Sequence, residues 1–163
     1  MSDHYNVLFL CTGNSARSIM AEAILNQKGH GTFTAYSAGT DPAGTPRPEA
    51  LKELEDAGIP TANLRSKSWD EFVTPDAPDM DFVFTVCDDA ANEPCPVWPG
   101  EPITAHWGVP DPAAVKGTPA EIERAFSDTF TILERRISLF LALPHAALNE
   151  IALHHELHNI GKQ

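Results

Sequence analysis

A short apolar run, Val7-Leu8-Phe9-Leu10, ends at Cys11, and the polar loop 12–16 follows it directly. From Arg17 to about Lys28 the apolar residues recur at helical spacing. The sequence therefore predicts a buried strand, a tight loop and a helix in direct succession. A loop of this kind turns its backbone N–H groups inward, and the positive end of the helix dipole lies beside it. We expect a binding site for an oxyanion, with a thiol at its base.

Cys11 is expected to be a charged nucleophile. Beside a helix N-terminus and a fixed guanidinium, the pKa of a cysteine falls from about 8.5 to roughly 4–7, and the thiolate is the reactive form. Arg17 can hold two oxygens of a tetrahedral anion through its planar guanidinium. Gly13 and Asn14 both tolerate the positive φ that a tight loop requires. The alternative is a core cysteine at a strand end, followed by an ordinary turn.

Strand and helix patterns alternate along the rest of the chain. The expected strands are 5–11, 33–37, 81–86 and 103–106, and the expected helices are 17–28, 48–57 and 119–143, with a short helical turn after Ser68. This order predicts an α/β fold, a single domain in which a four-stranded parallel sheet carries helices on both faces. We expect residues 1–143 to form this catalytic domain, and residues 144–163 to form a C-terminal helical extension that packs on it or extends from it.

The predicted strand ends carry polar and thiol side chains. In sheets of this kind ligands bind beyond the carboxyl ends of the strands, where the strand order reverses. Cys11, Ser37, Cys87 and His106 all lie at such ends. We therefore expect two thiols, Cys11 and Cys87, at the same edge of the sheet.

Composition limits the classes of partner. The 163 residues are 42% hydrophobic, enough to fill one core. A formal net charge of −12 argues against nucleic acid and anionic membrane surfaces as partners. No apolar run is long enough to span a membrane, and the first four residues lack a basic export region, so we expect a cytoplasmic protein. Three cysteines in a reducing compartment favour reactive thiols over a structural disulfide framework.

Three segments together resemble a known family. Residues 7–22 read V-L-F-L-C-T-G-N-S-A-R-S-I-M-A-E, residues 37–40 read S-A-G-T, and Asp111-Pro112 comes late in the chain. The combination resembles the low-molecular-weight protein tyrosine phosphatase superfamily, and more closely its arsenate reductase branch, over about residues 5–143. The resemblance implies that Cys11 is the nucleophile, Arg17 the oxyanion clamp and Asp111 the general acid. It also implies that Asn14 fixes the loop and that Ser18 supports the thiolate. The anion site would comprise Thr12, Gly13, Asn14, Ser15, Ala16, Arg17 and Ser18.

A general acid is also required by the chemistry. Oxygen displaced from a tetrahedral oxyanion is a poor leaving group, so a carboxylic acid must protonate it as the bond breaks. Asp111 lies between Pro110 and Pro112 in a rigid segment after the last predicted strand, which places it over the loop. The alternative is a turn aspartate that binds its own backbone.

Two features favour a reductase over a phosphatase. Phosphatases of this superfamily often have a second cysteine before the clamp arginine and aromatic residues after the Asp-Pro pair, whereas this chain has Ala16 and Ala113-Ala114. Without the aromatic residues, a phosphotyrosine ring has no wall to pack against. Cys87 and Cys95 supply a thiol pair instead, and reduction of arsenate to arsenite needs two electrons from thiols. Phosphate is expected to compete with arsenate. No bound cofactor or metal is expected.

The resemblance implies a thiol relay. Cys11 attacks arsenic, Cys87 then attacks Cys11 to release arsenite, and Cys95 attacks Cys87, so that thioredoxin reduces the final disulfide. Seven residues separate Cys87 and Cys95, one more than in the thioredoxin-linked enzymes of this branch, so glutathione with glutaredoxin is the alternative donor.

Two further functions stay open. One is hydrolysis of phosphate monoesters by a low-molecular-weight protein tyrosine phosphatase. The other is non-catalytic binding of arsenite or zinc through Cys87 and Cys95, with His106 as a further ligand. Arg65 and Lys67 are either anion ligands or solvated loop residues.

Overall fold

The protein is built on a four-stranded parallel sheet. The computed structural model describes residues 4–86, 102–143 and 150–161. The strands are β1 (Tyr5–Cys11), β2 (Phe33–Gly39), β3 (Phe82–Thr85) and β4 (Ile103–His106). They are ordered β2-β1-β3-β4, and each neighbouring pair is parallel. The predicted parallel sheet is confirmed, and β2 extends two residues beyond the predicted segment 33–37.

Helices follow the strands as the alternating pattern predicts. The α-helices are α1 (Arg17–Lys28), α2 (Pro48–Asp56), α4 (Pro119–Leu141) and α5 (Glu150–Ile160), and the 3-10 helices are η1 (Trp69–Phe72) and η2 (Pro112–Ala114). α4 begins with a capping box, in which Thr118 and Glu121 satisfy each other's backbone N–H groups. Ser68 caps η1 by accepting a hydrogen bond from Asp70 N.

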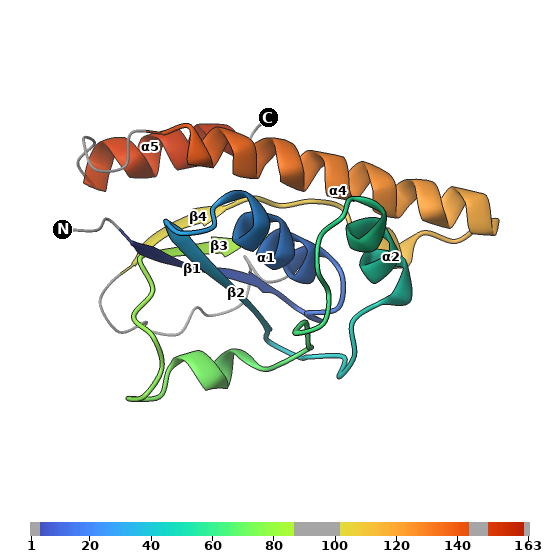
Figure 1. Ribbon diagram of the computed structural model, residues 1–163, viewed down its shortest axis with the longest axis horizontal. Helices are drawn as coiled ribbons and strands as arrows, with labels where there is room; N and C mark the ends of the chain where they lie inside the picture. The colour runs from blue at the N-terminus through green and yellow to red at the C-terminus, as the bar shows by residue number, and fades with distance from the viewer. Residues whose placement is uncertain (1–3, 87–101, 144–149, 162–163) are drawn as a thin grey trace.

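The two faces of the sheet are covered differently (Figure 1). Alternate residues of β1 point to opposite faces, because side chains in a strand alternate. Val7 and Phe9 pack into the large core beneath α1, α2, α4 and α5. Leu8 and Leu10 pack into a smaller cluster that includes Phe72 of η1. The expected arrangement, one α/β domain with helices on both faces, is therefore present, with the α-helices of the described residues on one face and η1 on the other.

α5 packs against the end of β4. Leu157 is fully buried and Ile160 almost so, and both belong to the large core. The indole Nε1 of Trp107 donates a hydrogen bond to Leu157 O at 3.0 Å. In the described part of the tail, α5 is thus attached to the sheet.

The fold places Cys11 where such sheets bind ligands. Strands β2 and β3 flank β1 on opposite sides, so the strand order reverses at β1, and Cys11 is its last residue. Ligand sites in doubly wound sheets form at this kind of position. Among the residues that the structure describes, no helix combines the length and the apolar character needed to cross a membrane.

Candidate functional site

The loop after Cys11 has its carbonyl groups turned outward. Backbone N–H groups of the segment 40–47 donate to them, in the pairs Thr40–Cys11 at 3.1 Å, Asp41–Thr12 at 2.9 Å, Ala43–Gly13 at 2.8 Å and Arg47–Ser15 at 2.7 Å. In a trans peptide the C=O and the following N–H point in opposite directions. The N–H groups of the loop therefore face its interior, as expected for an anion-binding loop.

The sulfur of Cys11 lies among hydrogen-bond donors. Cys11 is 2% exposed, its Sγ lies 2.9 Å from the hydroxyl of Ser18, and the backbone N–H of Asn14 donates to it at 3.2 Å. Donors directed at a sulfur stabilise its charged form. At the start of α1, Ala16 supplies no side-chain cap, so the helix offers its N-terminal backbone to the same region.

Asn14 ties the loop to the rest of the fold. Its φ of 46° lies in the left-handed region, which Asn adopts more readily than most residues. Its Nδ2 donates to Ser18 Oγ at 2.8 Å and to Ser37 Oγ at 3.0 Å, and its Oδ1 accepts from the backbone N–H of Lys67 at 2.8 Å. The positive φ expected of this loop is found at Asn14, whereas Gly13 does not adopt one.

A close approach of β2 to the loop requires Gly39. A Cβ at this position would lie 2.5 Å from Thr12 O and 3.0 Å from Asn14 Cβ. No side chain fits in that space without moving the loop. The S-A-G-T segment therefore contributes to the site by its lack of a side chain at position 39.

Arg17 and Asp111 are brought together although they are far apart in sequence. Nη1 of Arg17 donates to Val109 O at 3.0 Å, and Nη2 lies 3.5 Å from Asp111 Oδ2. The Arg17 side chain is 12% exposed and that of Asp111 is 41% exposed. Asp111 Oδ1 also accepts a hydrogen bond from Ala113 N at 2.9 Å. Asp111 is therefore both the turn residue of the alternative interpretation and a carboxyl group beside Arg17.

The thiol pair of the predicted relay lies in a segment that the structure does not describe. Cys87 and Cys95 lie outside the described residues. His106, the third proposed ligand, has its Nδ1 2.7 Å from the hydroxyl of Thr85. Within residues 4–86, 102–143 and 150–161, no group of three metal-ligating side chains comes together.

Behind the loop, the buried Ser37 and Lys67 and the partly buried Glu22 make contacts that the sequence interpretation missed. Ser37 donates to Glu22 Oε1 at 2.5 Å, and Lys67 Nζ lies 3.5 Å from the same oxygen. Lys67 is only 8% exposed, so the interpretation of it as a solvated loop residue is wrong. Arg65, by contrast, lies at the surface, where it binds Glu71 through two hydrogen bonds of 3.0 and 2.6 Å.

A signal for Glu22 is present in the sequence. Glu22 follows Ser18 by four residues, and residues four apart share a helix face. Since Ser18 is buried beside the sulfur, a carboxylate on the same face of α1 suggests a polar network rather than a surface charge.

Burial changes the pKa values of both Glu22 and Lys67. It raises the pKa of Glu22, an effect that the neighbouring Lys67 charge opposes. It lowers the pKa of Lys67, an effect that the Glu22 charge opposes. The charge of each group therefore opposes the effect of burial on the pKa of the other.

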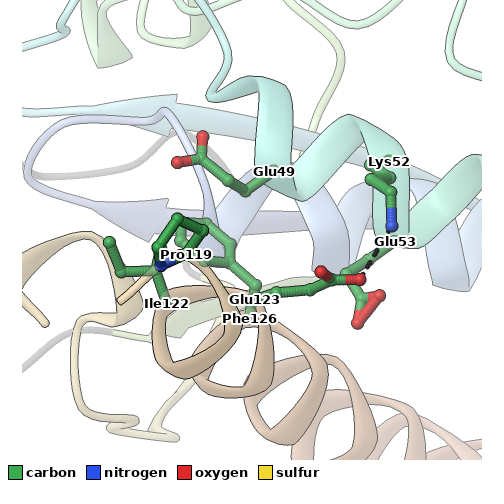
Figure 2. Close-up of a pocket in the computed structure, with 7 residues that line it drawn as sticks. All are labelled: Glu49, Lys52, Glu53, Pro119, Ile122, Glu123 and Phe126. Carbon is green, nitrogen blue, oxygen red and sulfur yellow. Dashed lines mark hydrogen bonds and ion pairs between the residues drawn. The ribbon is translucent and has the colours of Figure 1, made fainter. Parts of the chain in front are cut away.

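A second concave region lies between α2 and α4 (Figure 2). It is lined by Glu49, Lys52, Glu53, Pro119, Ile122, Glu123 and Phe126. Lys52 crosses it to Glu123 at 2.8 Å. None of its lining residues belongs to the loop after Cys11, so the groove is separate from the anion-binding loop.

Comparisons with known proteins agree with this geometry. The profile of the family described as "Low molecular weight phosphotyrosine protein phosphatase" matches residues 6–151. The arsenate reductase of Bacillus subtilis (strain 168) is 40% identical over 115 residues, which are 71% of this chain and 79% of the relative. The crystal structure of an arsenate reductase from Archaeoglobus fulgidus is 28% identical, with a TM-score of 0.60, over 81% of this chain and 98% of that one. A thioredoxin-dependent arsenate reductase of Corynebacterium glutamicum is 26% identical, with a TM-score of 0.55, over 85% of this chain and 64% of that one.

Proposed function

Because the chain belongs to the low molecular weight phosphotyrosine protein phosphatase family, we propose that it is an enzyme that uses Cys11 as its nucleophile, and that its reaction is the reduction of arsenate to arsenite. The assignment of Cys11 as the nucleophile rests on the position of its sulfur. The sulfur lies 2.9 Å from Ser18 Oγ and 3.2 Å from Asn14 N, at the base of a loop whose N–H groups face inward. The reaction is supported by the 40% identity to an arsenate reductase over 71% of the chain.

In the first step the Cys11 thiolate attacks arsenic. The loop N–H groups and the Arg17 guanidinium bind the remaining oxygens, since both donate hydrogen bonds in fixed directions. Asp111, beside Arg17, protonates the departing oxygen, which leaves as water. The product of this step is a covalent Cys11 adduct in which arsenic is still pentavalent.

The second step transfers two electrons. The Cys87 thiolate attacks the Cys11 sulfur, a disulfide forms, and the electron pair of the sulfur–arsenic bond leaves with arsenite. Cys95 then attacks Cys87, which frees the Cys11 thiolate and leaves a Cys87–Cys95 disulfide. A dithiol donor reduces this disulfide and becomes oxidised itself. We propose thioredoxin as the donor, supported by the thioredoxin-dependent relative from Corynebacterium glutamicum, with glutathione and glutaredoxin as the alternative.

The chain also has features that disfavour tyrosine phosphatase activity. Asp111 is followed by the short helix η2, whose residues are Pro112, Ala113 and Ala114. Their side chains are too small to form the wall against which an aromatic leaving group packs. Phosphate itself is expected to occupy the loop as a competitor, because its tetrahedral oxyanion matches arsenate in shape and charge.

One assay tests the function and the donor together. The reduced protein is incubated with arsenate and either thioredoxin or glutaredoxin, and separately with an aryl phosphate. We expect arsenite with one donor, inhibition by phosphate and negligible aryl phosphate hydrolysis. The Cys95→Ser variant should release about one equivalent of arsenite and then stop with thioredoxin. Rapid aryl phosphate hydrolysis that persists in the Cys87→Ser variant would instead assign the phosphatase function.

A further inference from the structure

The C-terminal helix α5 ends against the segment 107–111, which leads from β4 to Asp111. The indole Nε1 of Trp107, the first residue of this segment, donates to Leu157 O at 3.0 Å. Both residues are fully buried. The family profile matches residues 6–151, so Leu157 lies beyond the part of the chain that it covers. The contact therefore joins the matched part of the chain to residues outside it.

Gly161 brings the end of α5 against the backbone at the same place. A Cβ at this position would lie 2.5 Å from His106 O and 2.9 Å from Cδ1 of Trp107. The first of these is a backbone atom, so it cannot give way unless the chain after β4 moves with it. A side chain at position 161 would therefore push α5 and the segment 107–111 apart.

Burial of α5 does not by itself require these two contacts. Leu157 and Ile160 belong to the large core, and apolar burial has no preferred direction. The indole hydrogen bond does have a preferred direction. The contact at Gly161 places backbone against backbone. Together the two contacts set where the segment 107–111 lies relative to α5.

A shift at Trp107 would reach Asp111, because the segment between them is short and restrained. Trp107 precedes Asp111 by four residues, and Pro110 and Pro112 restrict the backbone on either side of Asp111. Val109 is held through its N–H by the chain just after β3 and through its carbonyl by α1. The segment therefore has little freedom to absorb a displacement at its first residue.

We propose that α5 is a positioning element for Asp111, and that Trp107 and Gly161 are the positioning residues through which it acts. The catalytic part of this inference rests on the proposed function, in which Asp111 is the general acid. The part that concerns the place of the segment 107–111 does not rest on it, because it is a property of the resting protein. The two parts are measured separately.

Two variants disturb the contact in different ways. Trp107→Phe keeps an aromatic ring against Phe84 and loses the indole donor. Gly161→Ala keeps every donor and forces the end of α5 away from His106 O. Leu54→Ala is the matched control, because it removes a fully buried side chain of the large core from α2, outside both α5 and the segment 107–111.

Hydrogen exchange measures the place of the segment without any substrate. Peptides that cover residues 107–115 should exchange about fivefold faster in Trp107→Phe and in Gly161→Ala, the effect of about one net hydrogen bond. Leu54→Ala should leave this rate unchanged, because its loss of stability acts on global unfolding and not on local opening of the segment.

Activity is measured as a single turnover, with the reduced protein in excess over arsenate, so that no donor is needed. Trp107→Phe and Gly161→Ala should each lower the maximal rate of arsenite formation about tenfold, because the acid is misplaced. The half-saturating protein concentration should change less, because the anion-binding loop remains. Leu54→Ala should change neither quantity.

The Asp111→Asn background shows whether α5 acts through Asp111. Adding Gly161→Ala to Asp111→Asn should lower the rate by less than about twofold more, since an acid that is already absent cannot be misplaced. A full tenfold further loss would overturn the proposal. Exchange rates in both Trp107→Phe and Gly161→Ala that equal those of the parent would do the same. If the parent itself forms no arsenite, the proposed function fails, while hydrogen exchange still decides whether α5 holds the segment.

Discussion

At the scale of single residues, the loop after Cys11 is held in shape from behind by Asn14. Its side chain makes three hydrogen bonds, and its backbone has the positive φ that the loop requires. Asn is required at this position because it supplies both properties, the side-chain hydrogen bonds and the positive φ. A residue with only one of them would leave either a strained backbone or unsatisfied polar groups.

Substitution of Asn14 should separate the two contributions. Asn14→Gly keeps a permitted backbone conformation and loses the side-chain bonds, which together are worth about 3 kcal/mol of unfolding free energy. Asn14→Ala loses the bonds and also strains the backbone, at a further cost of about 1 kcal/mol. Urea unfolding measures both values. Equal stability of the two variants would contradict a role for the φ of Asn14.

The buried Glu22 should leave a signature in the pH dependence of stability. Burial raises its pKa above the ordinary value of 4.5. Between pH 4.5 and the raised pKa, the folded protein binds more protons than the unfolded chain, so the contribution of Glu22 to the unfolding free energy falls as pH rises. Glu22→Gln should therefore gain stability relative to the parent as the pH rises from 4.5 towards the raised pKa of Glu22. Glu55→Gln, at an exposed position, serves as the control. If the unfolding free energies of the parent and of Glu22→Gln run parallel against pH, the expectation is contradicted.

At the scale of elements, the segment after β4 is held by arginines from two helices. Arg17 at the start of α1 donates to Val109 O, and Arg136 of α4 donates to Trp107 O at 3.0 Å and to Gly108 O at 3.1 Å. These bonds supply side-chain donors to backbone carbonyl groups just beyond the end of β4. Asp111 follows directly, so its place beside Arg17 depends on both helices.

Arg136→Met should loosen the segment that carries Asp111. One buried and one partly buried carbonyl group lose this donor, at a cost of about 2–3 kcal/mol of unfolding free energy. We also expect kcat to fall more than KM rises, because the proposed general acid is displaced while the anion-binding loop remains. Arg135→Met removes the neighbouring exposed arginine and should change neither quantity. Thermal unfolding and steady-state kinetics with arsenate provide the measurements.

The element boundaries show how much local pattern determines. The extents of β1, β4 and α1 agree with their predicted ranges, because apolar runs and helical spacing mark both ends. β3 is shorter than the predicted 81–86, and β2 runs on to Gly39. The longer β2 follows from pairing, since β2 continues as far as β1 offers partners, up to Cys11 opposite Gly39. Pairing partners are not visible in a local window of sequence.

At the scale of the whole molecule, α5 completes the core. Its Leu157 side chain is fully buried, and its backbone accepts the indole hydrogen bond of Trp107. Trp107 in turn stacks on Phe84 of β3 with ring centroids 4.0 Å apart. The helix therefore reaches the central strands through one aromatic side chain. How the chain divides at residue 143 stays a prediction.

Leu157→Ala should destabilise the whole domain. Removing a fully buried leucine side chain costs about 2–5 kcal/mol, and the cavity would lie against Trp107. Glu156→Ala changes the exposed neighbour on the same helix and should leave the unfolding free energy nearly unchanged. Chemical denaturation followed by tryptophan fluorescence measures both. A loss for Leu157→Ala no larger than for Glu156→Ala would show that α5 is not part of the cooperative core.

The sequence by itself determined the strand, loop and helix around Cys11, because each depends on residues within a few positions of one another. It also determined the alternation of elements and hence the parallel sheet. Only the tertiary structure decided that Asp111 lies beside Arg17 and that Glu22 and Lys67 pair behind Asn14. These contacts join residues from separate elements, and their meeting depends on strand order and on how helices pack, neither of which a local pattern specifies.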